Sequence, residues 1–406
     1  MLEWRTMVIE HMMSQSTSTL PVYLKIISEP SKQRISSDPD NHKTSPTTGH
    51  HTDNLYSIAA GMTPGELSEA LAQLTVNLPQ PNRNIAFLFT GQGSQYHGML
   101  RDLYQSSSDV RNTIHRCHDY LLAKHGIDCL AVLFGSNVDL INRTENTQPC
   151  LFMAAYTLAS LWQQIGIQPD YLIGHSIGEI AAACFAGALD LESALDCVAI
   201  RARLMGQLPK TSGMVAVIAD LDKTIECAQG LPIDIAGINH QKQTIVSGDY
   251  AALEQFNSQC QNMRIRTTPL CVSHGFHSRH MDPILDEFYQ EVSGIQFKRM
   301  NTPIISTVSG ECIDEISADY LTNQIRQSVN FLKAAESLPD QPLFHIEIGP
   351  QPILTRMIKK IRPNNQIGLA SLNPKIKDPI ALINCLHVLA NQCEIDWDFV
   401  KSGLFS

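Results

Sequence analysis

Short apolar runs alternate with amphipathic stretches over most of this chain. Residues 85–89 form a nearly all-apolar run that stops at the glycine-rich stretch GQGSQ, a pattern typical of a buried central strand. Further along, YLIGHSIGEIAAACFAGAL passes from a strand pattern through a glycine-bracketed turn into an Ala-rich helix pattern. Strands that alternate with helices in this way predict an α/β fold with a mainly parallel sheet.

A different periodicity occupies residues 211–273. The short β-like runs GMVAVIA, IDIAGIN and QTIVSGD are interleaved with the helical runs DLDKTIECAQGL and DYAALEQFNSQC. A β-α-β-β-α-β order of this kind predicts a small ferredoxin-like subdomain. We expect it to be inserted between the two parts of the large α/β subdomain, residues 86–210 and 274–390.

The two ends of the chain differ from this middle. Residues 1–54 predict an extension and a disordered linker, because the stretch 29–54 is rich in Ser, Thr, Pro, Asp and His and nearly lacks large apolar residues. Residues 55–85 predict a linker helix region, in which Thr63 caps and Pro64 begins the helix MTPGELSEALAQLTVNL. We expect residues 391–406 to form a short C-terminal tail.

Composition narrows the class of protein. The chain has 406 residues, of which 43% are hydrophobic, and its net charge of −10 disfavours nucleic acid, which binds basic surfaces. Its 11 cysteines contain no CxxC pair and lie mostly in apolar runs, which predicts reduced, buried thiols. No stretch approaches the roughly 18 apolar residues of a spanning helix, and the N-terminus lacks the apolar core of a secretory signal. We therefore expect a soluble, cytoplasmic protein.

The stretch GHSIG at residues 174–178 fits the pattern G-x-S-x-G between a strand and a helix. Its glycines permit a sharp turn that exposes Ser176 as a nucleophile, and the amide of Ile177 at the helix N-terminus can stabilise an oxyanion. The alternative is a chance match in a glycine-rich turn. The stretch GQGSQ at residues 91–95 also follows a strand and can bring a second amide to the oxyanion. Its alternative is a phosphate-binding loop, although the pattern G-x-x-x-x-G-K is absent.

Arg201 lies in the helical stretch DLESALDCVAIRARLMGQL, for which Asp190 is the expected cap. It borders an apolar stripe, whereas Arg203 points nearly opposite, toward solvent. The stripe consists of Leu191, Leu195, Val198, Ala202 and Met205. A cation at the edge of a buried face needs an anionic partner, which is either an internal carboxylate or the carboxylate of a substrate.

The stretch CVSHGFHSRHM carries His274, His277 and His280 at even spacing. This spacing is compatible with a metal site, with a general base and its neighbours, or with exposed polar side chains. A zinc cage would need a further ligand or an open position, and the stretch has the character of a loop. We expect no metal here, one general base, and His280 at the surface.

Together these motifs resemble one family. GQGSQ, TQPCLF, GHSIGE, IRARLM, INHQKQTIVSGD, SHGFHS, QIRQSVNF and IEIGPQP occur in the order typical of malonyl-CoA:acyl carrier protein transacylases, and most nearly of the acyltransferase domains of polyketide synthases. The resemblance extends over residues 55–400. It implies an α/β-hydrolase-like large subdomain with a parallel sheet and an inserted ferredoxin-like small subdomain, in agreement with the periodicities above.

The resemblance also implies a role for each matching residue. Ser176 matches the acylated nucleophile, His277 its base, and Arg201 the arginine that binds a substrate carboxylate. The remaining matches are Gln92 and Ile177 at the oxyanion hole, His175, His274 and Phe276 at the substrate, and Gln324 and Asn239 as residues that orient the catalytic imidazole, Gln324 through its backbone carbonyl.

The segment HGFH at residues 274–277 bears on acyl selectivity. Malonyl-type members of the family carry HAFH there and methylmalonyl-type members YASH, and an aliphatic residue after the serine, here Ile177, also accompanies malonyl. Phe276 would fill the space of an α-methyl branch, a discrimination of roughly 1–3 kcal/mol. Gly275 stands in place of the usual alanine, which predicts a slightly looser pocket and less strict selectivity.

The resemblance implies an acyltransferase of polyketide or fatty-acid biosynthesis. It would move a malonyl group from malonyl-CoA, through an ester of Ser176, to the phosphopantetheine thiol of an acyl carrier protein. We expect a monomer without bound metal, cofactor, nucleic acid or membrane, with a ketosynthase or other synthase modules as further partners. Two alternatives stay open: an acyl hydrolase that clears carrier proteins, disfavoured by Arg201, and a non-catalytic docking module, disfavoured by the intact Ser176 and His277.

Overall fold

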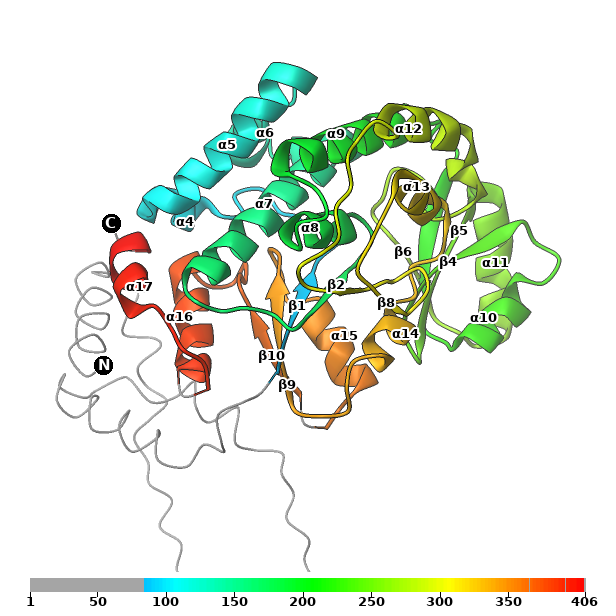
Figure 1. Ribbon diagram of the computed structural model, residues 1–406. Helices are drawn as coiled ribbons and strands as arrows, with labels where there is room; N and C mark the ends of the chain where they lie inside the picture. The colour runs from blue at the N-terminus through cyan, green and yellow to red at the C-terminus, as the bar shows by residue number, and fades with distance from the viewer. Residues whose placement is uncertain (1–83, 365, 391, 405–406) are drawn as a thin grey trace, which may run out of the picture. The chain divides into compact units, whose positions relative to one another are not determined.

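Two β-sheets and the helices around them make up the described part of the chain (Figure 1). The structure is a computed structural model that describes residues 84–364, 366–390 and 392–404. The extension expected at residues 1–54 and the helix expected near Pro64 lie outside the described residues. Within the tail expected at residues 391–406, the structure describes the helix α17 (Trp397–Gly403).

The large sheet has six strands among the described residues, and neighbouring strands run parallel except for the last pair. In order across the sheet they are β10 (Gln366–Ala370), β9 (Leu343–Ile348), β1 (Asn84–Phe89), β2 (Tyr171–Gly174), β7 (Ile304–Ile305) and β8 (Cys312–Ile313). β1 lies inside the sheet, and five of its six residues are buried. The predictions of a buried central strand and a mainly parallel sheet are confirmed.

Helices cover both faces of the large sheet. Those before the small sheet are α4 (Arg101–Ser106), α5 (Ser108–His125), α6 (Cys129–Phe134), the 3-10 helix η3 (Leu140–Asn142), α7 (Thr144–Gln164), α8 (Ile177–Phe185) and α9 (Leu191–Gln207). Those after it are the 3-10 helix η4 (Arg279–Ile284), α12 (Leu285–Val292), α13 (Ala318–Arg326), α14 (Phe331–Glu336), α15 (Leu354–Ile361) and α16 (Asp378–Leu389).

The alternation of side chains along β1 explains this layering. Phe89 points to the face covered by α8, where its ring centroid lies 6.1 Å from that of Phe185. Leu88 points to the other face and joins a core with Phe331 of α14 and Ile358 of α15. Because both faces are covered by helices, the strand is apolar at almost every position.

The small sheet has four antiparallel strands. In order they are β4 (Ile233–His240), β5 (Gln243–Asp249), β3 (Ser212–Val217) and β6 (Thr267–Pro269). α10 (Leu221–Ala228) and α11 (Tyr250–Asn262) cover one face, over a core that includes Val246 and Phe256. Ala216, Ala236 and Ile245 form a cluster of their own. The order β-α-β-β-α-β along the chain confirms the predicted ferredoxin-like arrangement.

All eleven cysteines lie in the described residues, and each is a free thiol. Eight of them are buried, and Cys271 and Cys312 are exposed. The prediction of unpaired, mostly buried thiols is therefore confirmed. Among the helices that the structure describes, none is long and apolar enough to cross a membrane.

Candidate active site

The turn between β2 and α8 holds Ser176 in a strained conformation. Its φ angle is 54°, in the left-handed region that residues with a side chain seldom adopt. Two glycines make the turn possible: a Cβ atom at Gly174 would collide with the backbone of Glu179, and one at Gly178 with the carbonyl of Phe89. The glycines of G-x-S-x-G are thus required by close backbone approach, and the predicted strand–turn–helix is confirmed.

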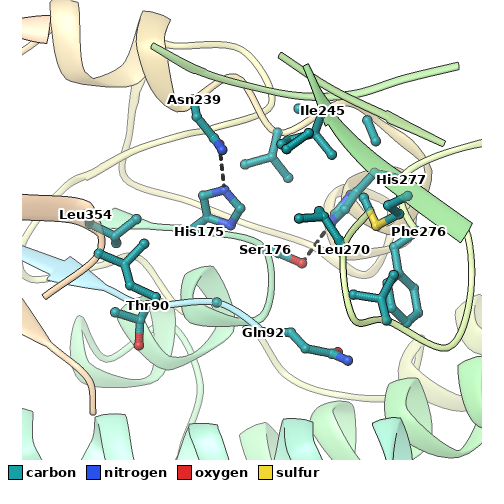
Figure 2. A pocket seen from close by; sticks show the side chains of 18 of the residues that line it. Thr90, Gln92, His175, Ser176, Asn239, Ile245, Leu270, Phe276, His277 and Leu354 are labelled. Carbon is teal, nitrogen blue, oxygen red and sulfur yellow. Dashed lines mark hydrogen bonds between the residues drawn. The ribbon is translucent and has the colours of Figure 1, made fainter. Parts of the chain in front are cut away.

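Ser176 and His277 point toward each other in the wall of the cavity between the two sheets (Figure 2). Ser176 Oγ lies 2.7 Å from His277 Nε2, although the two residues are 101 positions apart. On the other side of the ring, Nδ1 lies 2.9 Å from the carbonyl oxygen of Gln327. Because a carbonyl only accepts, Nδ1 carries the proton and Nε2 has a free lone pair that accepts the serine O–H.

The electrostatic surroundings keep this imidazole neutral. Burial, the positive charge of Arg201 and the neighbouring His175 together lower the pKa of His277 to about 3. A neutral imidazole at 2.7 Å from a hydroxyl is the arrangement that a general base needs. His277 also has a φ angle of 54°, so both members of the Ser–His pair have strained backbones.

Arg201 lies beside the nucleophile, in the helix that Asp190 caps as predicted. Asp190 Oδ1 accepts the backbone N–H of Ser193 at 2.7 Å. The Arg201 side chain donates from Nη1 to Gln148 Oε1 at 2.6 Å and from Nη2 to Ser176 Oγ at 3.1 Å. Arg203 faces solvent, as predicted, and pairs with Glu291.

No carboxylate of the described residues pairs with Arg201, so the alternative of an internal salt bridge is wrong there. The residue is only 2% exposed, and its Nε atom has no hydrogen-bond partner in the described part of the chain. Burial lowers its pKa to about 9. A buried guanidinium without a counter-ion is costly, and an anionic ligand would compensate it. Gln148, which holds Nη1, was not among the predicted site residues, although it belongs to the quoted stretch TQPCLF.

The loop after β1 lies directly against the Ser176 turn. A Cβ atom at Gly91 would lie 2.5 Å from the carbonyl oxygen of His175 and 2.9 Å from its Nδ1 atom. Glycine therefore allows the loop to bring Gln92 into the cavity wall next to Ser176. Ile177 is the first residue of α8, so its amide lies at the helix N-terminus, as the predicted oxyanion hole requires.

The cavity has a volume of about 280 Å³ and two chemically different ends. The polar end contains Ser176, His277, Arg201, Gln92 and Gln148. Apolar side chains from the small sheet and from the region of α15 line much of the rest, among them Ala216, Ala236, Ile245, Leu354 and Met357, together with the polar side chains of Asn239 and Gln243. Phe276 also lines the cavity, as predicted, so an acyl group on Ser176 would have a cation at one side and apolar walls at the other.

The structure corrects the prediction for Gln324. The carbonyl that accepts from His277 Nδ1 belongs to Gln327. The Gln324 backbone also raises the pKa of the imidazole, but less than that of Gln327. α13 ends at Arg326 and Gln327 is extended, so the Gln327 carbonyl is free to turn toward the imidazole. The side chain of Gln324 instead donates to the Ser176 carbonyl at 2.7 Å and supports the turn.

The predicted role of Asn239 in orienting the catalytic imidazole is also wrong. Its Oδ1 atom lies 3.3 Å from Nε2 of His175, so it contacts the residue before the nucleophile and not the catalytic imidazole. Its Nδ2 atom donates to Gln243 Oε1 at 3.3 Å. His175 and Asn239 both line the cavity, and burial lowers the pKa of His175.

His274 does not line the cavity, contrary to the prediction. It is 1% exposed, and its ring lies behind Phe276 at a centroid distance of 5.9 Å. Nε2 lies 2.8 Å from the Leu208 carbonyl, and Nδ1 lies 2.7 Å from Ser273 Oγ. His274 thus anchors the wall that Phe276 forms. The rings of His274 and His277 have separate partners, and no group of three His, Cys, Asp or Glu side chains in the described residues could hold a metal ion.

Gly275 has a different effect from the one predicted. It does not line the cavity. A Cβ atom there would lie 3.2 Å from the Gly213 carbonyl and from Ser212 Cβ, and 3.1 Å from a ring carbon of His280. The absent methyl group therefore lets the segment lie close against β3 and does not widen the acyl pocket. His280 is partly buried by this contact, so its expected surface position is only partly right.

Sequence reasoning missed a buried carboxylate below the nucleophile. Glu179 is 1% exposed and accepts from Thr307 Oγ1 at 3.0 Å, from Gln324 Nε2 at 3.4 Å and from the hydroxyl of Tyr320. Burial raises its pKa. The residue ends the quoted stretch GHSIGE, so its place in that motif was the available signal. Its contacts tie α8 to α13.

Comparison with known proteins agrees with this geometry. Residues 86–388 match the acyl transferase domain family. Polyketide synthase 2 of Metarhizium robertsii is 30% identical over 350 residues, which are 81% of this chain and 16% of that protein. The acyltransferase domain from the second module of the salinomycin polyketide synthase superposes with a TM-score of 0.77 at 28% identity, covering 85% of this chain and 84% of that one. The malonyl-CoA-acyl carrier protein transacylase of Clostridium perfringens superposes with a TM-score of 0.69 at 27% identity, covering 76% and 97%.

The chain belongs to the acyl transferase domain family. Within that family it is an acyltransferase of the type found in polyketide synthases and in malonyl transacylases, which confirms the resemblance seen in the motifs. The chain spans only 14–17% of the length of the polyketide synthases that it resembles, including that of Metarhizium robertsii.

Proposed function

We propose that this acyltransferase loads a malonyl group from malonyl-CoA, through an ester of Ser176, onto the phosphopantetheine thiol of an acyl carrier protein. The observation that carries the proposal is the buried Arg201, which has no carboxylate partner in the described chain and lies 3.1 Å from the nucleophile. A planar guanidinium can bind a carboxylate through two parallel hydrogen bonds. A substrate whose carboxylate is separated from its reacting carbonyl by a single carbon fits this site, and malonyl is the unbranched diacid thioester of that kind.

The first half-reaction forms the ester. Ser176 Oγ attacks the thioester carbonyl carbon while His277 Nε2 takes the hydroxyl proton, and the amides of Ile177 and Gln92 stabilise the oxyanion. When the tetrahedral intermediate collapses, the carbon–sulfur bond breaks and His277 returns the proton to the CoA thiolate. The Gln327 carbonyl keeps Nδ1 protonated throughout, so Nε2 serves first as the base and then as the acid.

The second half-reaction reverses these roles. His277 Nε2 takes the proton of the carrier-bound phosphopantetheine thiol, and its sulfur attacks the ester carbonyl carbon. Collapse of this second intermediate breaks the bond to Ser176 Oγ, which recovers its proton from His277. Arg201 holds the distal carboxylate in both steps, and no metal or bound cofactor is needed for acyl transfer of this kind.

An anionic substrate also makes the base stronger. The charge of Arg201 is one cause of the low pKa of His277. A carboxylate bound to Arg201 cancels much of that charge, so the basicity of the imidazole rises when malonyl-CoA binds. A neutral acyl-CoA would leave the charge uncompensated and the base weak. The contact between Arg201 and the substrate carboxylate would thus favour both substrate binding and proton transfer to His277.

Size selection would come from the wall of the cavity. Phe276 lines the cavity that contains Ser176, the His274 ring packs against it, and its carbonyl accepts a hydrogen bond from Ser247 Oγ. A wall anchored on both sides disfavours a branch at the α-carbon. We therefore propose malonyl over methylmalonyl, with the modest discrimination of about 1–3 kcal/mol that one methyl group gives.

The proposal is tested by incubating the protein with an acyl carrier protein and malonyl-, methylmalonyl- or acetyl-CoA, followed by intact mass spectrometry of both proteins. We expect a malonyl ester on Ser176 and malonyl on the carrier, with methylmalonyl loading slower by about 10–100-fold. An unchanged carrier together with free malonate would identify the alternative, an acyl hydrolase. Equal loading of acetyl and malonyl would contradict recognition of the carboxylate.

A further inference from the structure

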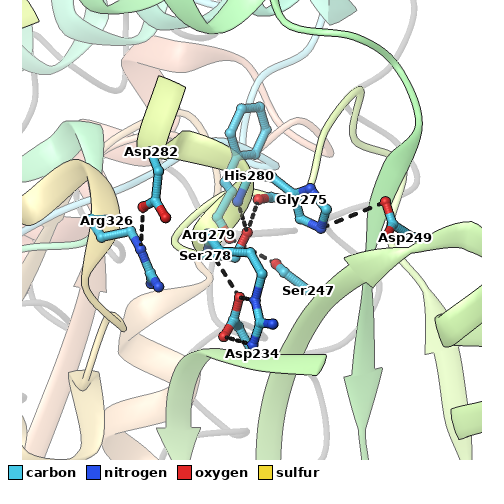
Figure 3. Close-up of polar contacts among 10 residues, drawn as sticks. Asp234, Ser247, Asp249, Gly275, Ser278, Arg279, His280, Asp282 and Arg326 are labelled. Atoms are coloured by element: carbon cyan, nitrogen blue, oxygen red, sulfur yellow. Dashed lines mark hydrogen bonds and ion pairs between the residues drawn. The ribbon is translucent and has the colours of Figure 1, made fainter. Parts of the chain in front are cut away.

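Strands of the small sheet contact the chain on both sides of His277 (Figure 3). On β5, Ser247 Oγ donates to the carbonyl of Phe276, the residue before His277, at 2.7 Å. On β4, the carboxylate of Asp234 accepts from the backbone N–H, Nε and Nη2 of Arg279, two residues after His277, each at 2.9 Å. The backbone that carries the catalytic imidazole is therefore tied to two neighbouring strands.

β4 also reaches the group that orients the ring. Ile238 donates its N–H to the Val329 carbonyl at 2.9 Å, and Val329 donates its N–H to the Ala236 carbonyl at 3.0 Å. These two bonds form a parallel bridge between Gly237 of β4 and Val329. Val329 follows two residues after Gln327, whose carbonyl accepts the Nδ1 proton of His277. The same strand thus fixes both the backbone of His277 and its hydrogen-bond partner.

The strained backbone of His277 makes these ties necessary. A residue with a φ angle of 54° keeps that conformation only where its surroundings impose it. Loss of the ties would let the segment relax, and the imidazole would move away from Ser176 Oγ. Displacements of about 1 Å can lower the rate of a positioned reaction by up to about 100-fold.

We propose that β4 is the positioning element of the catalytic imidazole, acting through Asp234 and through its bridge to Val329. The small sheet then has a second role besides lining the cavity. Because it holds the backbone around His277, its packing on the large sheet sets the Ser176–His277 distance. This inference rests on the proposed acylation of Ser176, but not on which acyl group is transferred.

The test compares two ion pairs between an arginine and an aspartate. Asp234→Ala removes the Asp234–Arg279 pair, and Asp314→Ala removes the pair in which Asp314 accepts from Arg299 at 2.9 and 2.5 Å, away from the cavity. The pre-steady-state rate of Ser176 acylation by malonyl-CoA is measured for both, with KM and Tm. We expect Asp234→Ala to acylate about tenfold more slowly with KM within twofold of the parent value, and Asp314→Ala to keep the parent rate. Asp314→Ala should keep the parent Tm, because its pair with Arg299 is exposed. The Asp234 side chain is only 17% exposed, so Asp234→Ala should lower Tm somewhat, and its rate is compared at a temperature at which both variants are fully folded.

Arg279→Lys provides a second, milder variant, which retains the charge but loses the fork of the guanidinium. We expect its acylation rate to lie between those of the parent protein and Asp234→Ala. If Asp234→Ala does not fold, the acylation rate of Arg279→Lys alone tests the positioning role. A parent-like rate in the folded variants would overturn the positioning role. So would a rate loss that merely follows a fall in Tm. Failure of the parent protein itself to acylate would instead refute the proposed function.

Discussion

Arg201 donates a hydrogen bond from Nη2 to Ser176 Oγ at 3.1 Å, so the buried cation directly contacts the nucleophile. Its second nitrogen, Nη1, is held by the neutral amide of Gln148 at 2.6 Å. A neutral partner fixes the direction of the guanidinium without neutralising it. The charge is therefore available to a ligand, and the site is arranged for an anion.

Arg201→Ala should convert the preference for malonyl into one for neutral acyl groups. Loss of a buried charge-assisted pair costs about 2–5 kcal/mol, so malonyl loading should fall by at least about 30-fold. Acetyl loading should stay constant or rise, because the pKa of His277 increases once the neighbouring cation is gone. Competition between malonyl-CoA and acetyl-CoA, read by mass spectrometry of the acyl-enzyme, measures the change.

Arg203→Ala is the matched control, since Arg203 lies on the same helix but faces solvent and pairs with Glu291. It should leave both loading rates within twofold of the parent values. Undiminished malonyl loading by Arg201→Ala would show that the carboxylate is bound elsewhere.

The pH dependence of Ser176 acylation should lack the usual inflection of a histidine near pH 6.5. The pKa of His277 is lowered to about 3, so the free enzyme keeps its neutral base well into the acid range. At the alkaline end, malonyl loading should decline above about pH 9, where Arg201 loses its proton. Profiles of kcat/KM report the ionisations of the free enzyme and therefore measure both limbs.

The Arg201→Ala variant should change both the acid limb and the alkaline limb of the kcat/KM profile. Removing the cation stabilises the imidazolium, so the acid limb moves to higher pH, although burial keeps it below pH 6.5. The alkaline limb should disappear. An unshifted acid limb would mean that Arg201 does not act on His277 electrostatically.

Gly275→Ala should change stability with little effect on selectivity, whereas Phe276→Ala should change selectivity as well as stability, because Phe276 is buried and lines the cavity. The new methyl group at position 275 presses on the Gly213 carbonyl and Ser212, so the free energy of unfolding should fall by about 1–2 kcal/mol. The ratio of malonyl to methylmalonyl loading should change by less than about threefold, since Gly275 does not line the cavity. Phe276→Ala removes part of the cavity wall and should shift that ratio toward methylmalonyl by about tenfold or more. Denaturation in urea and parallel loading assays separate the two effects.

Asp378→Asn should stabilise the protein at neutral and alkaline pH. Burial and the neighbouring Asp102 carboxylate raise the pKa of Asp378 from 3.8 to about 6, so the folded state binds its proton more tightly than the unfolded state. Stability from this group is greatest below pH 4 and is lost as the pH rises through 6. The variant should gain about 1–3 kcal/mol over the parent at pH 8 and almost nothing at pH 4. Equal gains at both pH values in urea denaturation would contradict this origin.

Patterns in the sequence predicted the parts of the site that depend on local structure. The periodicity of the helix 191–207 distinguished the buried Arg201 from the exposed Arg203, and the glycines around Ser176 predicted its turn. The apolar run 85–89 and the β-α-β-β-α-β order predicted the two sheets. In each case the signal in the sequence lies within one stretch of the chain or in the order of neighbouring elements.

The wrong predictions concern contacts between distant elements. The partner of His277 Nδ1 is the backbone carbonyl of Gln327. Every residue has a backbone carbonyl, so side-chain identity could not distinguish that of Gln327 from that of the predicted Gln324. Asn239 contacts His175 only because β4 docks beside the Ser176 turn. Likewise, the direction of the missing methyl group at Gly275 depends on how its segment lies on β3.

The order of the chain also has a consequence for synthesis on the ribosome. Ser176 is made 101 residues before His277, and the carbonyl that holds the imidazole follows another 50 residues later. A nascent chain that has emerged only through the small sheet thus exposes a serine with no base to activate it. Reactivity toward thioesters should begin only after residues beyond 327 have emerged and folded, and β9 and β10 of the large sheet follow later still. The onset of acylation during translation would therefore report when the large sheet has formed and the small sheet has docked on it.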